Sequence, residues 1–165
     1  MSITSVLTFK TNSDVNLIDA RGPRFGAVLT TIVLTTFMAT GSLQLLYWQL
    51  AVFTLGAFVG VTPYSFIYRR FVKPRLSGDV PTEDVRPPQF AQLVGFLFTT
   101  SATISYLLGA EMLGLVIISF ALAAAFLNAA FNYCLGCEVY LLIARAKNAV
   151  ASRRNLEDSY NLPSL

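Results

Sequence analysis

The sequence predicts an all-α membrane protein with four transmembrane helices, arranged as two tandem helical hairpins. Of its 165 residues, 55% are hydrophobic and only 13% are charged, and the mean hydropathy is +0.60. In soluble domains the charged fraction is about a quarter. Three stretches, 25–68, 87–110 and 112–137, contain no Asp, Glu, Lys or Arg. Each exceeds the roughly 20 apolar residues that cross a bilayer, and the first is long enough for two crossings.

The small residues Thr40-Gly41-Ser42 divide the first stretch, because such residues favour a turn. The predicted transmembrane domain covers 23–145, after an N-terminal arm (1–22) and before a tail (146–165). We expect the polar end of this tail, 152–165, to be a flexible extension. The arm carries two acidic groups and lacks the basic start of an export signal, so we expect it to be retained. The expected membrane helices are 23–40, 44–70, 88–108 and 112–134.

The positions of the cations predict the orientation, since Lys and Arg of short loops stay on the cytoplasmic side. All 12 lie in three segments, which are the arm with the start of the first helix (10–24), the end of the second helix with the middle loop (69–86), and the chain from 145 to 154. Both termini and the middle loop should therefore be cytoplasmic, in a multi-pass protein of the plasma membrane. The net charge of +3 suits anionic lipid headgroups. Nucleic-acid binding is not expected, because the cations are dispersed and no recognition motif accompanies them.

A phrase of the sequence occurs twice. DARGPRF at 19–25 precedes the first predicted hairpin, and DVRPPQF at 84–90 precedes the second. Proline suits the first turn of a helix, and an aspartate before it suits the positive end of the helix dipole. Because both copies begin in the cytoplasm, they predict a parallel repeat with a pseudo-twofold axis along the membrane normal.

The chain has two cysteines, Cys134 and Cys137, spaced as in thiol-disulfide oxidoreductases. A redox or regulatory dithiol, a metal site and simple packing are the three interpretations. A structural zinc site uses four Cys or His ligands, whereas this chain has no histidine, so we expect no metal and no cofactor. Asn132 lies close enough in sequence to share a site with the pair.

The reactivity of the pair depends on where the fourth membrane helix ends. If it runs to the cysteines, the negative end of its dipole and Glu138 raise the pKa of the thiols. If the helix breaks at Gly136, Cys137 instead begins a new amphipathic helix at about 138–151, at a favourable end. The reducing cytosol makes a permanent structural disulfide unexpected.

Read together, DARGPRFGA, PYSFIYRRFVKPRL, VRPPQFAQLVG and NYCLGCEVYLL resemble the bacterial membrane-protein family catalogued as domain of unknown function 4395 (DUF4395), over roughly residues 17–145. The resemblance implies a bacterial protein and no established activity. Family members are often encoded near thioredoxin-like or sulfurtransferase proteins, which implies a role in thiol or sulfur chemistry. Besides the cysteine pair, the family pattern marks Arg21, Pro23, Tyr64, Arg70, Arg86, Pro88 and Gly136.

The residues Arg21, Arg70 and Arg86, with Tyr64, are candidate binding residues at a cytoplasmic mouth that attracts anions. Two functions remain open. In the first, Cys134 and Cys137 form a membrane dithiol that exchanges electrons or sulfur with a soluble thioredoxin-like or rhodanese-like protein. In the second, the chain is a non-enzymatic accessory subunit of a larger membrane complex, or a homodimer, packed through small-residue faces such as 56–60.

Overall fold

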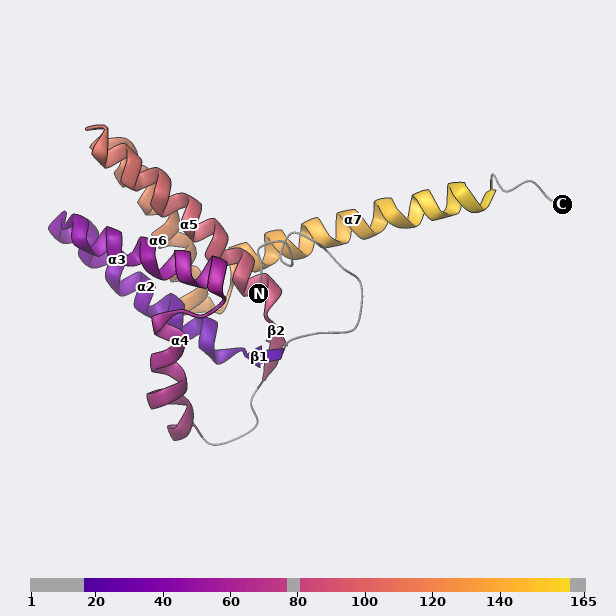
Figure 1. The fold of residues 1–165 in the computed structure, drawn as a ribbon, viewed down its shortest axis with the longest axis horizontal. Helices are drawn as coiled ribbons and strands as arrows, with labels where there is room; N and C mark the ends of the chain where they lie inside the picture. The colour runs from indigo at the N-terminus through magenta and orange to yellow at the C-terminus, as the bar shows by residue number, and fades with distance from the viewer. Residues whose placement is uncertain (1–16, 77–80, 161–165) are drawn as a thin grey trace.

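The computed structural model describes residues 17–76 and 81–160 and is predominantly helical (Figure 1). Most of the predicted N-terminal arm, residues 1–16, lies outside the described residues, as do 161–165 at the end of the predicted tail. The helices that could cross a membrane are grouped together, and helix α7 (Leu135–Tyr160) extends away from them.

Within residues 17–76 and 81–160, three helices are long and apolar enough to cross a membrane, and they agree with three of the predicted spans. They are α2 (Arg21–Thr40), α5 (Arg86–Leu107) and α6 (Glu111–Phe131). A fourth candidate is a pair of helical segments, Leu43–Val59 and Pro63–Arg75, bent by 82° at a short break.

The prediction of one continuous helix over 44–70 is wrong. The first segment consists of α3 (Leu43–Thr54) and the π-helical turn η1 (Leu55–Val59). Gly60 then adopts a left-handed conformation, φ +76°, which glycine accepts without a steric penalty. Pro63 follows three residues later and cannot donate a backbone hydrogen bond to a preceding turn. Hydropathy alone concealed this break, because the residues around it remain largely uncharged.

The helical segment after the break begins with a capping box. The Oγ1 of Thr62 accepts the backbone N–H of Ser65 at 3.0 Å, and the Oγ of Ser65 accepts the backbone N–H of Thr62 at 3.1 Å. Such reciprocal bonds satisfy backbone donors that a helix start leaves without partners. The segment then runs through three short helical pieces, which are α4 (Pro63–Ile67), η2 (Tyr68–Val72) and η3 (Lys73–Arg75).

Two short strands, which the sequence did not predict, join the two copies of the repeated phrase. Strand β1 (Leu17–Asp19) pairs antiparallel with β2 (Thr82–Asp84), directly before α2 and α5. The last residue of each strand then caps the helix that follows. A carboxylate oxygen of Asp19 accepts the backbone N–H of Arg21, and one of Asp84 accepts that of Arg86, both at 3.0 Å. The two phrases thus have the same local structure.

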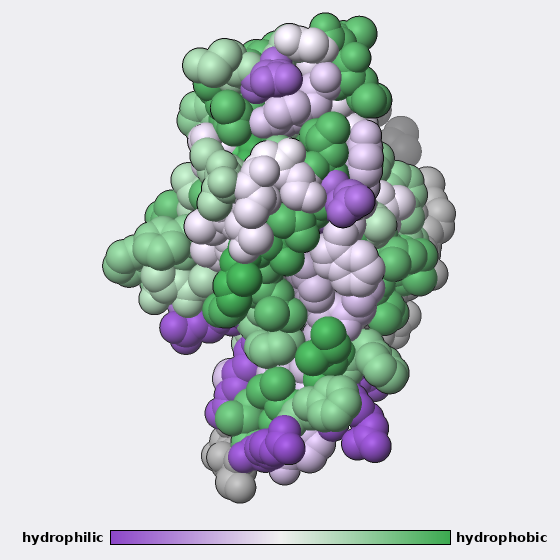
Figure 2. Space-filling model, turned by 90° about the vertical axis from the view of Figure 1, so that its left-hand side faces the viewer, coloured by the Kyte–Doolittle hydropathy of each residue, from purple (hydrophilic) through white to green (hydrophobic). Residues whose placement is uncertain are grey.

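The buried core lies where α2, α3, α5 and α6 meet, and it consists of Leu34, Phe37, Leu46, Ala102, Ile118 and Ala121. Large apolar side chains also cover the outside. Ile32, Leu97 and Phe120 are each more than half exposed. Figure 2 shows apolar side chains over much of one face, with most of its hydrophilic residues gathered at the lower end. Exposed apolar area of this extent marks an interaction or membrane surface.

Candidate functional site

The cysteine pair lies at a break between α6 and α7. Helix α6 ends at Phe131, and Asn132 caps it in the left-handed conformation with φ 56°. Asparagine is one of the few residues that tolerate this conformation. Asn132 is exposed and donates its backbone N–H to the carbonyl of Asn128 at 3.1 Å. An asparagine at this position is therefore explained by its role in ending α6.

Cys134 occupies the position immediately before α7. The backbone N–H of Cys137 donates to the Sγ of Cys134 at 3.3 Å, and the N–H of Glu138 donates to the carbonyl of Cys134 at 3.0 Å. The side chain of Cys134 therefore caps the helix. The break falls earlier than Gly136, and α7 is longer than the predicted 138–151, so that residues 152–160, expected in a flexible extension, are helical.

The expectation that the pair lies within the C-terminal end of the fourth membrane helix is wrong. Cys134 instead lies at the N-terminal end of α7, where the helix dipole and the free backbone N–H groups favour negative charge. The two cysteines form a disulfide with each other, and both are half-buried. A pair at such a position has the geometry in which a thiolate is stabilised after reduction.

The start of α7 packs closely on α5. A Cβ added to Gly136 would lie 2.7 Å from the Cβ of Ala91, so only glycine permits this approach. One turn later, buried Tyr140 packs its ring 5.7 Å from that of Phe90. Burial raises the pKa of Tyr140, while the charge of Arg86 opposes the rise. These contacts fix the peptide that carries the disulfide against the body of the protein.

The arginines and the tyrosine predicted as a binding mouth lie in different surroundings. Arg21 and Arg86 begin α2 and α5 beside the β1–β2 ladder, whereas exposed Arg70 lies over the ring of Phe71 at 5.7 Å. Tyr64 is buried. That these residues bind a ligand stays a prediction.

Tyr64 belongs to a polar network inside the protein. Its hydroxyl donates to the Oε1 of Gln49 at 3.1 Å and accepts the indole N–H of Trp48 at 3.1 Å. The Nε2 of Gln49, which is fully buried, donates to the Oγ1 of Thr30 at 3.2 Å. The network joins α2, α3 and α4, so it holds the bent fourth segment to the first helix.

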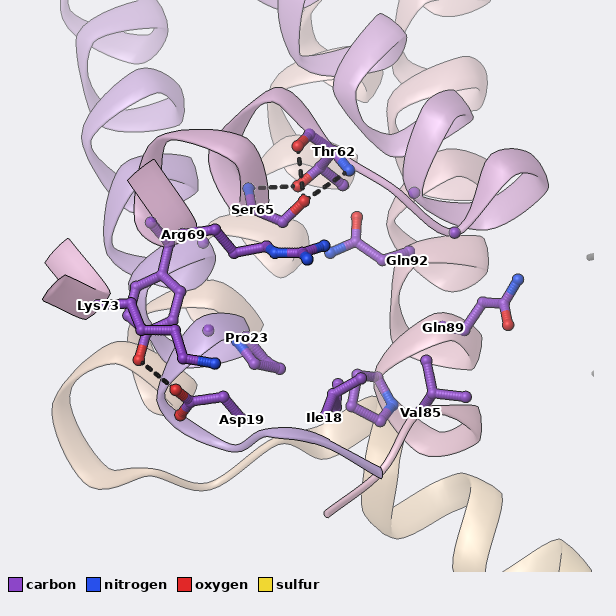
Figure 3. A pocket seen from close by; sticks show the side chains of 16 residues that line it. Ile18, Asp19, Pro23, Thr62, Ser65, Arg69, Lys73, Val85, Gln89 and Gln92 are labelled. Carbon is purple, nitrogen blue, oxygen red and sulfur yellow. Dashed lines mark hydrogen bonds between the residues drawn. The ribbon is translucent and has the colours of Figure 1, made fainter. Parts of the chain in front are cut away.

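A cavity of about 360 Å³ lies beside the break at Gly60, between the α4–η3 segment and α5. We call it the α4–α5 cavity. The sequence analysis did not predict its polar lining. Gln89 and Gln92, two amides one turn apart in a predicted membrane helix, could have indicated it. Among the lining residues are Asp19, Thr62, Ser65, Tyr68, Arg69, Lys73, Gln89 and Gln92 (Figure 3).

The two breaks in the chain are built alike. A left-handed residue, Gly60 or Asn132, ends one helix, and the second residue after it caps the next helix. At the first break the cap is Thr62, which accepts the N–H of Ser65. At the second break Cys134 accepts the N–H of Cys137, so the cysteines stand where the other break has two hydroxyls.

Metal binding has no support in the described residues, where no group of three or more His, Cys, Asp or Glu side chains is placed to hold an ion. The groups around Cys134 and Cys137 are backbone N–H donors and apolar side chains. Together, the helices and the pair define a helical protein with candidate membrane spans and a disulfide at the start of a helix.

The chain belongs to the family described as Domain of unknown function (DUF4395), whose model matches residues 18–145. The predicted family membership is confirmed. No curated protein and no solved structure matches the chain.

Proposed function

We propose that the protein is a membrane-bound dithiol that exchanges disulfides with a soluble thiol protein, with Cys134 as the attacking sulfur and Cys137 as the resolving one. The observation that carries the proposal is the position of Cys134 as the N-terminal cap of α7. A thiolate there meets the backbone N–H of Cys137 and the positive end of the dipole.

The exchange would run in two balanced steps. The thiolate of reduced Cys134 attacks one sulfur of a partner disulfide, forming a mixed disulfide and releasing the other partner sulfur as a thiolate. Cys137 then loses its proton and attacks the Sγ of Cys134. The mixed disulfide breaks, the partner leaves as a dithiol that has gained two electrons and two protons, and the pair is oxidised. The disulfide between Cys134 and Cys137 corresponds to the oxidised state of the pair in this scheme.

A thioredoxin-like or rhodanese-like protein suits the partner role, because the surroundings of the pair are open and apolar. Phe131, Tyr133 and Leu135 are 71%, 46% and 40% exposed, respectively. Exposed aromatic and apolar side chains around the pair suit the apolar core of an interface with another protein. A partner in the cytosol requires that the cysteine pair face the cytoplasm, and the distribution of cations supports that orientation.

We infer further that the two halves of the chain are a parallel tandem repeat of two hairpins, with four membrane crossings and both termini cytoplasmic in a bacterial plasma membrane. Equivalent bonds support the repeat. Gln89 on α5 donates to the carbonyl of Ala57 at 3.2 Å, and Arg24 on α2 donates to that of Ala129 at 3.3 Å.

Equivalent rings support the same repeat. The ring of Phe25 lies 5.8 Å from that of Tyr68, and the ring of Phe90 lies 5.7 Å from that of Tyr140. In this arrangement Leu43–Val59 is the counterpart of α6, and Pro63–Arg75 is the counterpart of α7. The bend of the fourth candidate is then the point where the chain leaves the membrane.

The test is disulfide trapping with the full chain in proteoliposomes, using purified oxidised thioredoxin as the probe. We expect Cys137→Ser to accumulate a mixed disulfide through Cys134, because the resolving thiol is missing. Cys134→Ser should accumulate at least about tenfold less, since its remaining thiol lacks the capping position. The double serine variant is the control. Equal trapping by the two single variants, or none by either, would contradict the proposal.

The small residues at 56–60, which suggested the accessory-subunit alternative, have roles within this chain. A Cβ on Gly56 would lie 2.7 Å from the Oε1 of Gln92 within the same chain, and Gly60 serves the break. The small residues at 56–60 therefore pack internally. Co-purification of a Cys134→Ala, Cys137→Ala variant with an intact larger complex, and with full function, would favour this alternative.

A further inference from the structure

We propose that the α4–α5 cavity binds a small phosphate ester, the chemistry shared by the headgroup of a glycerol-based anionic lipid and by a free polyol phosphate. The inference is independent of the cysteine pair. It stands on the charge of the lining, on the amide of Gln92, and on the place of the cavity in the fold.

The lining carries a surplus of positive charge. Arg69 and Lys73 come from the same helical segment, one turn apart, and Figure 3 shows Arg69 reaching across the cavity toward Gln92. The one lining carboxylate, Asp19, is already engaged. Its Oδ1 accepts the backbone N–H of Arg21 and its Oδ2 accepts the hydroxyl of Tyr68 at 2.8 Å. Two cations beside one engaged carboxylate favour an anionic ligand.

The amide of Gln92 lies at the end of the cavity that Arg69 reaches. Figure 3 shows its nitrogen turned toward Arg69, while its Oε1 faces the wall at Gly56. Nearby Gln89 instead donates to the carbonyl of Ala57 at 3.2 Å. A side-chain amide nitrogen donates hydrogen bonds, so beside the two cations it suits the oxygens of a phosphate.

The glycine at the wall of the cavity explains how this amide fits. A Cβ at Gly56 would approach the Oε1 of Gln92 to 2.7 Å and the Cγ2 of Thr62 to 2.8 Å. The absence of a side chain at this position thus leaves room for the glutamine and for what binds beside it.

The cavity is a feature of the first half of the repeat. At the second break, the positions of Gln89, Gln92 and Arg69 correspond to Arg24, Ala27 and Leu141. The correspondence follows from the paired bonds and rings described above, which relate 24 to 89 and 68 to 140. The same relation matches Lys73 to Arg145, so the second half keeps a cation there and carries Arg24 in place of Gln89. Only Gln92 and Arg69 are replaced by apolar residues, so these two side chains are the part of the lining that is particular to the first half.

The position of the cavity matches a headgroup. It lies at the end of the helices where β1 and β2 precede α2 and α5, and Gln92 is six residues into α5, about 9 Å from its start. Basic side chains at the boundary of a membrane bind anionic headgroups. The same groups would bind a free phosphate ester arriving from the aqueous side.

The test compares full-length variants in nanodiscs of phosphatidylglycerol or phosphatidylcholine, and in detergent with sn-glycerol 3-phosphate. Native mass spectrometry counts retained lipid, and thermal unfolding measures stabilisation. Replacing both cavity cations, Arg69→Ala with Lys73→Ala, should weaken phosphatidylglycerol retention at least about tenfold more than the matched control does, because it removes charge-assisted hydrogen bonds to the phosphate as well as surface charge. The matched control is Arg70→Ala with Arg75→Ala, which removes the same charge from groups that contact Phe71.

Gln92→Met supplies the second variant, for the case that the cation variant does not fold. It removes the Oε1, which accepts no hydrogen bond from the described part of the chain, together with the amide nitrogen, so the protein without ligand should be equally or more stable, while ligand-induced stabilisation is lost. Stabilisation by sn-glycerol 3-phosphate in detergent identifies a free ligand, and retention of phosphatidylglycerol alone identifies a lipid. Equal losses in the cation and control variants, or binding of neither probe by the wild-type protein, would overturn the proposal.

Discussion

The thiol at the start of α7 should ionise far more readily than its neighbour. In the Cys137→Ser variant, the Cys134 thiolate keeps the backbone N–H at position 137, which donates to it at 3.3 Å in the structure. A hydrogen bond to a charged group contributes about 1.5–3 kcal/mol, and partial exposure places this one at the lower end. Since about 1.4 kcal/mol corresponds to a factor of ten, the thiolate fraction near neutral pH should rise about tenfold.

The matched measurement is the same titration on Cys134→Ser, where Cys137 lies one turn inside the helix. No N–H in the described residues donates to its sulfur, so its thiolate should show no comparable gain. Thiolate absorbance in the ultraviolet, recorded against pH for both variants in detergent, gives the two fractions directly. Curves that coincide, or a Cys137 that ionises first, would refute the capping argument and with it the assigned order of attack.

Other predictions concern the framework. Tyr64→Phe leaves the buried Oε1 of Gln49 without its donor and should cost about 1–3 kcal/mol in a detergent unfolding titration; an unchanged midpoint would contradict the network. Gly95→Ala places a Cβ 2.6 Å from the ring of Phe53 and should destabilise by about 1–3 kcal/mol; a neutral effect would show that the ring moves aside freely. Burial raises the pKa of Glu83 above 4.5, so its contribution to stability, present below 4.5, should fade as pH rises through the folded pKa. Glu83→Gln should remove that pH dependence, and an unchanged profile would count against it.

The candidate membrane helices could be predicted because charge is absent from them and present between them. Three of the four spans began and ended within about three residues of their predicted limits, a usual error for boundaries. The break after Val59 could not be seen in hydropathy. Its signal was local: Gly60 followed by Thr62-Pro63 is a helix stop and a helix start in four residues.

The site was harder to predict because it depends on where helices stop and on what lies opposite them. The helix dipole destabilises a Cys134 thiolate at the end of one helix and stabilises it at the start of the next, and these two positions are only about two residues apart. Asn132 was the available signal, since asparagine tolerates a left-handed cap. The α4–α5 cavity needed tertiary structure, because Arg69 and Gln92 are distant in sequence and meet only after the chain bends.

The likeness of the two breaks allows the capping and redox roles of the cysteines to be separated. Thr62 and Ser65 start a helix with hydroxyls alone, so the variant Cys134→Thr with Cys137→Ser should rebuild the same capping box before α7. Under reducing conditions it should unfold within about 0.5 kcal/mol of the wild type, whereas the double alanine variant should lose about 1 kcal/mol. Disulfide exchange should vanish in both. Amide hydrogen exchange at residues 137 and 138 reports the cap locally. If the threonine-serine variant exchanged there as fast as the alanine variant, the cysteines would start α7 by a means that hydroxyls do not share.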